Sequence, residues 1–222
     1  MGKLVVVLLV LAGLAVGADR VGAVLAANEA EQRLVAEGFV DPSVTVHGFP
    51  FLTQLADRRF DRVSVDADRL QVAEGEARAV SGELLDVGGG PTGPVDVATL
   101  SAEGTVPYEV VRAAVDLPSL QIRAGSSGQV EVAQAVEIAG ETVDVVAQAR
   151  VRARGDRIRV VPTGLGTADG SLPPGLTRQV ADLMTFEYRL PELPEGLALE
   201  EVRAGADGFA VRVTGTDVSL RR

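Results

Sequence analysis

Few residues of this 222-residue chain have types and spacing suited to catalysis or metal binding. Asp66 and Asp68 flank one alanine, so both carboxylates lie on one face of a predicted strand, where they could bind a divalent cation or transfer a proton. A metal site needs more than two oxygen ligands, and the sequence marks no others nearby. A solvated strand face explains the pair better. A hydrolase or glycan transferase that works through these two carboxylates is the alternative.

Nucleophilic catalysis has equally little support. His47 is the single histidine of the chain, and no serine lies in a nucleophile elbow, the strained strand-to-helix turn that exposes a catalytic hydroxyl. Because no partner for it is apparent, His47 is predicted to be a structural or surface residue. The absence of cysteine excludes disulfides, thiolate zinc sites and a cysteine nucleophile. The sequence thus predicts no catalytic residue, no metal and no cofactor.

Two motif matches are better explained as turns. Residues 88–93 fit the G-x-G-x-x-G pattern of dinucleotide-binding loops, but Pro91 and Pro94 lack the backbone N–H groups that would bind phosphate, and no helix follows. We therefore predict a flexible loop over residues 82–94. Residues 154–156 spell the adhesion tripeptide Arg-Gly-Asp, and the Gly-Asp pair within it is also a typical two-residue hairpin turn.

Five arginines near that turn are the best candidates for binding an anion. In the hairpin that the turn predicts, Arg152 faces Arg159, and like charges directly opposite each other are destabilising. Either acidic neighbours such as Glu131 offset this charge, or the arginines bind an anionic lipid headgroup, since a guanidinium pairs well with phosphate. The headgroup candidates are Arg150, Arg152, Arg154, Arg157 and Arg159.

The overall charge excludes one class of partner. The chain has 21 basic and 31 acidic residues and a formal net charge of −10, whereas nucleic-acid binders need a basic surface. Its length fits one domain, or two small ones, and suffices for an ordinary hydrophobic core. No nucleic-acid partner is therefore expected.

The N-terminus is predicted to be an export or anchor segment. Lys3 precedes residues 4–18, the uncharged run LVVVLLVLAGLAVGA. As a helix this run spans about 22 Å, short of the roughly 30 Å hydrocarbon core of a bilayer and typical of a signal peptide. An uncleaved anchor whose helix continues to residue 25 is the alternative. We expect residues 1–18 to be a signal peptide or membrane anchor, and residues 19–222 to form a single domain outside the cytoplasm.

Three helices are predicted from apolar spacing and from the residues at helix ends. The longest covers residues 18–37 and ends at Gly38, a residue type favoured just after a helix. Two shorter helices are predicted over residues 107–115 and 174–185, each beginning with proline in its first turn. These helices are expected to pack against a sheet.

From residue 43 onward, apolar residues recur at every second position, as in antiparallel sheet. Turns at 139–140 and 155–156 keep one face of three strands apolar, because they pair Val130 with Ala149 and Val151 with Val160. A last hairpin turns at residues 207–208. The predicted fold class is α+β, with one long curved antiparallel sheet wrapping the helices.

Residues 46–54 combine a predicted turn with two of the six phenylalanines of the chain. Gly48 and Pro50 set the turn, and Phe49 and Phe51 alternate with them. Spacing alone favours core positions for both rings. The alternative is that they contact an apolar ligand.

This segment also resembles a known family. Residues 48–54, GFPFLTQ, resemble the signature of the LmeA-like phospholipid-binding envelope proteins of actinobacteria. Further similar segments cover essentially the whole chain in the same order: 18–21, 59–65, 106–108, 190–197 and 207–211. The resemblance implies an exported protein that binds phosphatidylinositol-type phospholipid and supports mannosylated envelope lipids. It also implies a fold related to the tubular lipid-binding (TULIP-like) proteins, without catalytic residues.

The leading hypothesis is a membrane-associated phospholipid-binding or lipid-transfer protein that holds acyl chains in an apolar groove. Phe49, Phe51 and Leu52 are the apolar lipid-binding candidates. The expected partners are phospholipid and, through the N-terminal segment, the membrane; the sequence leaves protein partners unknown. The alternative is a non-enzymatic envelope scaffold with a filled core that binds another protein.

Overall fold

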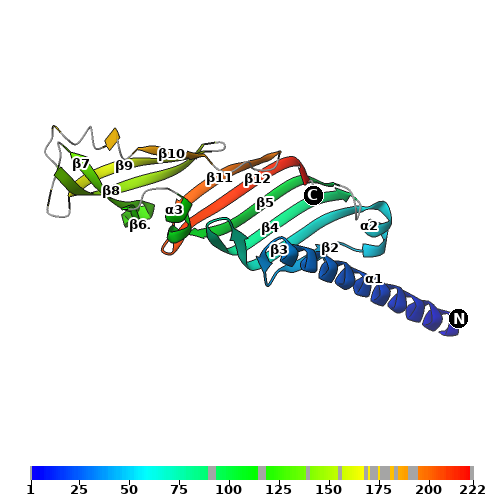
Figure 1. The fold of residues 1–222 in the computed structure, drawn as a ribbon. Helices are drawn as coiled ribbons and strands as arrows, with labels where there is room; N and C mark the ends of the chain where they lie inside the picture. Colours follow the sequence, from blue (N-terminus) through cyan, green and yellow to red (C-terminus); the bar gives the residue numbers. More distant parts are fainter. Residues whose placement is uncertain are drawn as a thin grey trace.

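The computed structural model describes residues 2–89, 94–114, 119–138, 141–154, 157–167, 170, 175, 181–182, 185–189 and 195–220. Across these residues the α-helices are α1 (Gly2–Ala36), α2 (Phe51–Asp57) and α3 (Tyr108–Ala114), and Ser126–Gly128 forms one 3-10 turn. Every sheet pairing between the described strands is antiparallel, and the strands form two sheets (Figure 1). The α+β class is therefore confirmed.

The first sheet is built from both ends of the described chain. Its strands are β1 (Phe39–Val40), β2 (Ser43–His47), β3 (Arg59–Val72), β4 (Gly75–Gly89), β5 (Val95–Pro107), β11 (Leu197–Ala204) and β12 (Gly208–Leu220). Their order is β1-β3-β4-β5-β12-β11, and β2 also pairs with β3. The last two strands of the chain thus complete a sheet begun by the first five.

The second sheet contains the strands between them. These are β6 (Gln121–Ala124), β7 (Val130–Ile138), β8 (Glu141–Arg154), β9 (Arg157–Thr167) and β10 (Phe186–Arg189), in the order β10-β9-β8-β7-β6. The pairings predicted from the two turns are confirmed, since Val130 pairs with Ala149 and Val151 with Val160. The turn residues themselves, 139–140 and 155–156, lie outside the described residues.

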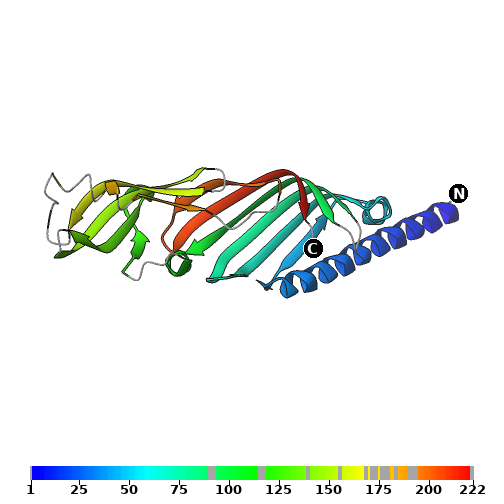
Figure 2. The same ribbon diagram turned by 45° about the horizontal axis from the view of Figure 1, so that its top comes forward.

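The two sheets lie end to end, with α3 between them and α1 projecting from the far end of the first sheet (Figures 1 and 2). The prediction of one long sheet is wrong, because the strands form two separate sheets. β5 ends at Pro107, which has no N–H to continue the ladder, and the chain turns there into α3. The helices are not wrapped by a sheet either, because α1 packs against β1, β2 and α2 at one edge.

The predicted loop over residues 82–94 is wrong for residues 82–89, which belong to β4. Asp86 lies in the left-handed region with φ of +51°, and such a residue interrupts the two-residue alternation of a strand. Leu84 and Val87, three positions apart, consequently pack in the same apolar cluster. Residues 90–93 lie outside the described part of the chain.

The predicted C-terminal end of the first helix is close to the observed one, but its predicted start is not. The helix predicted over 18–37 is observed as α1 from Gly2 to Ala36, and Gly38 follows it with φ of +95°. The helix predicted over 107–115 is α3, and most of the one predicted over 174–185 lies outside the described residues. Within the part of the chain whose side chains are described, no helix is both long and apolar enough to cross a bilayer.

One hydrophobic cluster joins the two sheets. Val145, fully buried on β8, and Leu199, buried on β11, belong to the same cluster, as do Tyr108 of α3 and Phe209 of β12. The rings of Tyr108 and Phe209 meet edge to face at 5.0 Å, and the Tyr108 hydroxyl donates to the Gly205 carbonyl at 2.7 Å. Burial, and then the charge of Asp207, raise the pKa of Tyr108, so its hydroxyl stays a donor. This cluster fixes the joint between the sheets.

Candidate functional site

The signature segment folds against α1 at the outer end of the first sheet. Gly48 has φ of +100°, the Phe49-Pro50 peptide bond is cis, and α2 begins directly after Pro50. α2 packs on α1 and on β3. We call this region, residues 19–22 together with residues 48–55, the α1–α2 corner. The sequence predicted a turn here but not the helix.

Gln54 holds the corner together from inside. Its side chain is 9% exposed, its Nε2 donates to the His47 carbonyl at 3.2 Å, and its Oε1 accepts the Asp61 N–H at 2.9 Å. A Cβ at Gly48 would overlap Gln54 Nε2, and the left-handed backbone there also favours glycine. The Gly and Gln of the signature therefore have a structural role, in shaping the turn before α2.

Asp19 ties α2 to α1. Its carboxylate is 2% exposed, and Oδ1 accepts the Leu52 N–H at 2.8 Å. Burial by itself raises the pKa of Asp19, but the backbone N–H groups of Leu52 and Phe51, together with Arg20, outweigh it. The net effect lowers the pKa below the ordinary value of 3.8. Since Asp19 follows the uncharged run directly, this bond fixes α2 at the end of that run.

Replacing Asp19 with Asn should flatten the acid dependence of stability. A carboxylate whose pKa is lowered by folding contributes stability above its unfolded pKa of about 3.9, and loses that contribution as the pH falls through the folded pKa. The midpoint temperature of thermal unfolding, followed by circular dichroism, should therefore fall more steeply below about pH 4 for the wild type than for Asp19→Asn. Parallel curves would contradict the role given to this carboxylate.

The three apolar lipid-binding candidates have different environments. Phe51 is 1% exposed, stacks on Phe60 with ring centroids 6.0 Å apart, and lies so close to Gly22 that a Cβ there would be 3.3 Å from the ring. Phe49 is 58% exposed and Leu52 47% exposed. Spacing predicted that both rings are core residues, which is confirmed for Phe51 and wrong for Phe49. Lipid contact at all three positions stays a prediction.

The candidate arginines pair across the second sheet as expected. Arg152 lies opposite Arg159 and Arg154 opposite Arg157. Arg150, Arg152, Arg157 and Arg159 are exposed, whereas the Arg154 side chain lies outside the description, and Arg157 and Arg159 each have an interaction partner.

Their neighbours along β8 show which way these side chains face. Val151 and Ala153 alternate with Arg150 and Arg152 and pack into the cluster between the sheets. The arginines of β8 therefore face away from that cluster. Glu131 was expected to offset part of the charge of these arginines. Its carboxylate instead accepts hydrogen bonds from Arg123 and from Gln148.

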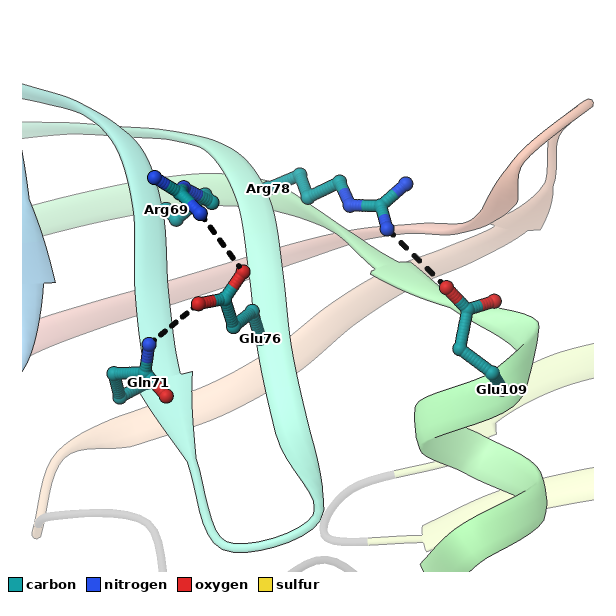
Figure 3. Close-up of polar contacts among 5 residues, drawn as sticks. All are labelled: Arg69, Gln71, Glu76, Arg78 and Glu109. Atoms are coloured by element: carbon teal, nitrogen blue, oxygen red, sulfur yellow. Dashed lines mark hydrogen bonds and ion pairs between the residues drawn. The ribbon is translucent and has the colours of Figure 1, made fainter.

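Another opposed arginine pair shows how the chain neutralises such charges. Arg69 lies opposite Arg78 between β3 and β4. Arg69 bonds Glu76 at 3.3 Å, while Arg78 reaches Glu109 of α3 at 3.2 Å (Figure 3). Gln71 also donates to Glu76, at 2.5 Å. Both arginines thus have carboxylate partners, and the Arg78–Glu109 pair ties α3 to the first sheet.

His47 does have a hydroxyl partner, contrary to expectation. Its Nε2 lies 2.9 Å from Ser64 Oγ. Ser64 is in the middle of β3, paired with Thr45 on one side and Glu83 on the other, so the backbone around it serves the sheet ladder. Asp66 shares this polar face, and no group of three metal-binding side chains occurs within the described residues. The arrangement suits a solvated sheet surface.

The opposite side of the first sheet is apolar. Val63, Leu84, Leu100 and Ala102 belong to one cluster, which is shared by strands β3, β4 and β5. The cluster at the joint continues the apolar surface through Val213 of β12 into the second sheet. Leu84, Ala102 and Val213 are only half-buried. We call this surface, made of both clusters, the apolar face.

Sequence reasoning missed Asp19, Gln54 and Leu55 as parts of the corner. A carboxylate directly after an uncharged run was a usable signal for Asp19, because a charge there needs a partner. For Gln54 the only signal was its place in the signature. Leu55 follows Leu52 by three residues, which puts both side chains on one side of a helix, but α2 itself was not expected.

No curated protein and no solved structure matches this chain. One family does match it. The sequence profile described as LmeA-like phospholipid-binding matches residues 17–216, a span that includes the α1–α2 corner, the joint and the strands of both sheets nearly to the end of β12. The chain therefore belongs to the LmeA-like phospholipid-binding family.

Proposed function

We propose that this protein is an exported, membrane-associated phospholipid-binding protein of the cell envelope that holds acyl chains against the apolar face. A phosphatidylinositol-type lipid, a TULIP-like mode of binding and a non-catalytic role are parts of the proposal. Membership of a phospholipid-binding family supports it. Residues 4–18 would attach the protein to the membrane if they are kept as an anchor, and would be removed after export if they are a signal peptide.

The observation that carries the proposal is the continuity of the apolar face. Val145 of the second sheet and Leu199 of the first lie in one cluster, so the apolar surface does not stop where the first sheet ends. The half-buried members, such as Leu84 and Ala102, retain surface that an acyl chain can cover. Each methylene buried there contributes about 0.8 kcal/mol, so about ten methylenes suffice for micromolar binding.

Native mass spectrometry of the full chain, purified in detergent without added lipid, tests the proposal. We expect a co-purified phospholipid, released and identified by fragmentation. After delipidation, the protein should take up phosphatidylinositol from vesicles. A protein that is lipid-free on purification and takes up none from vesicles would contradict the proposal.

A non-enzymatic scaffold with a filled core is the second candidate. It is favoured by the packing at the joint, where Leu120, Val130 and Val145 are at most 1% exposed. A scaffold would bind no lipid in the same measurement. Capture of a protein partner by such a lipid-free chain would support it.

The headgroup role of the arginine group gives a separate prediction. If the exposed arginines of β8 and β9 bind phosphate, replacing Arg152 and Arg159 with Gln should weaken binding of anionic phospholipid about tenfold, because two charge-assisted contacts are lost. Binding of phosphatidylcholine should not change. Since these side chains face away from the apolar face, equal affinities before and after substitution would assign them to the solvated surface.

A further inference from the structure

Exposed apolar residues are concentrated at one end of the molecule. Ten large apolar residues are exposed in the part of the chain that the structure describes. Seven of them lie on α1 before residue 26, on α2, or in the turn before α2. Exposed apolar residues gathered at one end of a molecule are typical of an interaction surface. The seven are Val16, Val21, Val24, Leu25, Phe49, Leu52 and Leu55.

The position of this surface follows from the Asp19 bond. α1 is one continuous helix that includes the uncharged residues 4–18, and Asp19 is the next residue along it. Because Asp19 accepts the Leu52 N–H at 2.8 Å, α2 lies beside the point where the uncharged run ends. Leu52 and Leu55, 47% and 49% exposed, are three residues apart on α2 and share one side of it.

Arg20 gives this surface the character of a bilayer interface. Its guanidinium lies 5.3 Å from the centroid of the exposed Phe49 ring and donates to the Gly48 carbonyl at 3.4 Å. Phenylalanine and leucine on the apolar side, with an arginine on the polar side, are typical of protein segments that lie at a bilayer interface. The arginine head can reach phosphate while the ring and the two leucines enter the acyl boundary.

The corner also leads directly to the apolar face. Phe51, which precedes the exposed Leu52, is buried and stacks on Phe60. Phe60 packs with Val63 and Val97 in the cluster of the first sheet. An acyl chain that leaves a bilayer at the corner would therefore meet apolar residues continuously. A protein partner would not need this continuity with the uncharged run and the apolar face.

We propose that the α1–α2 corner is a bilayer-docking surface, through which Phe49, Leu52 and Leu55 enter the membrane while Arg20 contacts headgroup phosphate. This inference rests on the proposed function, since it names the place where the lipid-binding protein meets its lipid source. A second copy of the chain is the competing occupant, and the test separates the two.

The absence of tryptophan from the chain makes depth measurement direct. Phe49→Trp and Leu55→Trp each place a single fluorophore at an exposed position of the corner. Val72→Trp at the end of β3, 39% exposed at the native valine, is the matched control. Each full-length variant is reconstituted in vesicles of phosphatidylcholine and phosphatidylglycerol with brominated acyl chains. Corner emission should fall about twofold relative to the control, since a docked face lies ~5–10 Å into the headgroup–acyl boundary.

Two further measurements decide between occupants. The first uses one equivalent of brominated lipid in unbrominated detergent micelles, where the emission of the corner variants should not fall. Quenching in these micelles would mean that the corner contacts a single bound lipid, and would overturn docking. Equal quenching of corner and control variants in vesicles would also overturn it. So would dimer sedimentation that Leu52→Asp abolishes. If the corner is quenched while mass spectrometry finds no bound lipid, docking stands and the proposed lipid-binding function fails.

Discussion

Replacing Phe51 with alanine should lower the free energy of unfolding by about 3–5 kcal/mol, the range for removing a fully buried phenylalanine. The ring is 1% exposed and fills the space between Gly22 of α1 and Phe60 of β3, so its loss leaves a cavity that α2 cannot close while it is bonded to Asp19. Urea unfolding followed by circular dichroism measures the change.

Phe49→Ala is the matched control for this prediction. The two rings are two residues apart and chemically identical, but Phe49 is 58% exposed and contacts Arg20. Its removal should cost less than about 1 kcal/mol, the scale of an exposed cation–π contact. Similar losses for the two variants would show that Phe51 does not support the corner.

Leu84→Asp should reduce phospholipid binding about tenfold or more. Leu84 is a half-buried member of the apolar face. A carboxylate at this position would lose its hydration if an acyl chain covered it, and this loss is energetically unfavourable. Loss of contact with two methylenes alone corresponds to about 1.6 kcal/mol, slightly more than a factor of ten in affinity. Uptake of a fluorescent phospholipid from vesicles provides the measurement.

Leu85→Asp is the control, since it makes the same change one residue further along β4. Leu85 pairs with Arg62 on β3 and Thr99 on β5, and so lies on the polar face of the sheet, where a carboxylate is solvated. Binding should stay close to that of the wild type. If both variants lose binding equally, then the apolar face is not the lipid site and the loss reflects damage to the sheet.

The pairing within the second sheet was predictable because β7, β8 and β9 follow one another in the chain and are joined by short turns. Alternation along residues 129–161 and two short turns fix which residues pair, and Val136 does lie opposite Val143 as these patterns require. The same patterns do not say which distant strand completes a sheet. The pairing of β5 with β12 therefore could not be predicted, and a single sheet was expected where two exist.

The corner was found from its signature, but its internal arrangement was not predictable. Which of Phe49 and Phe51 is buried depends on the packing of α1, whose Gly22 leaves room for one ring. The bond from Leu52 to Asp19 joins residues 33 positions apart, and no local pattern encodes it. Asp86, in the left-handed conformation, likewise shifted the apolar alternation that would have identified the end of β4.

The place of β12 determines when this protein can fold. β12 lies between β5 and β11, and its Arg212 bonds Glu103, a residue 109 positions earlier in the chain. During synthesis the first five strands exist long before the strand that covers β5, so the first sheet cannot be completed until residues 208–220 have been made. If the protein is exported as proposed, this delay leaves the first sheet incomplete as the chain emerges, and an incompletely folded polypeptide can be threaded through a translocation channel.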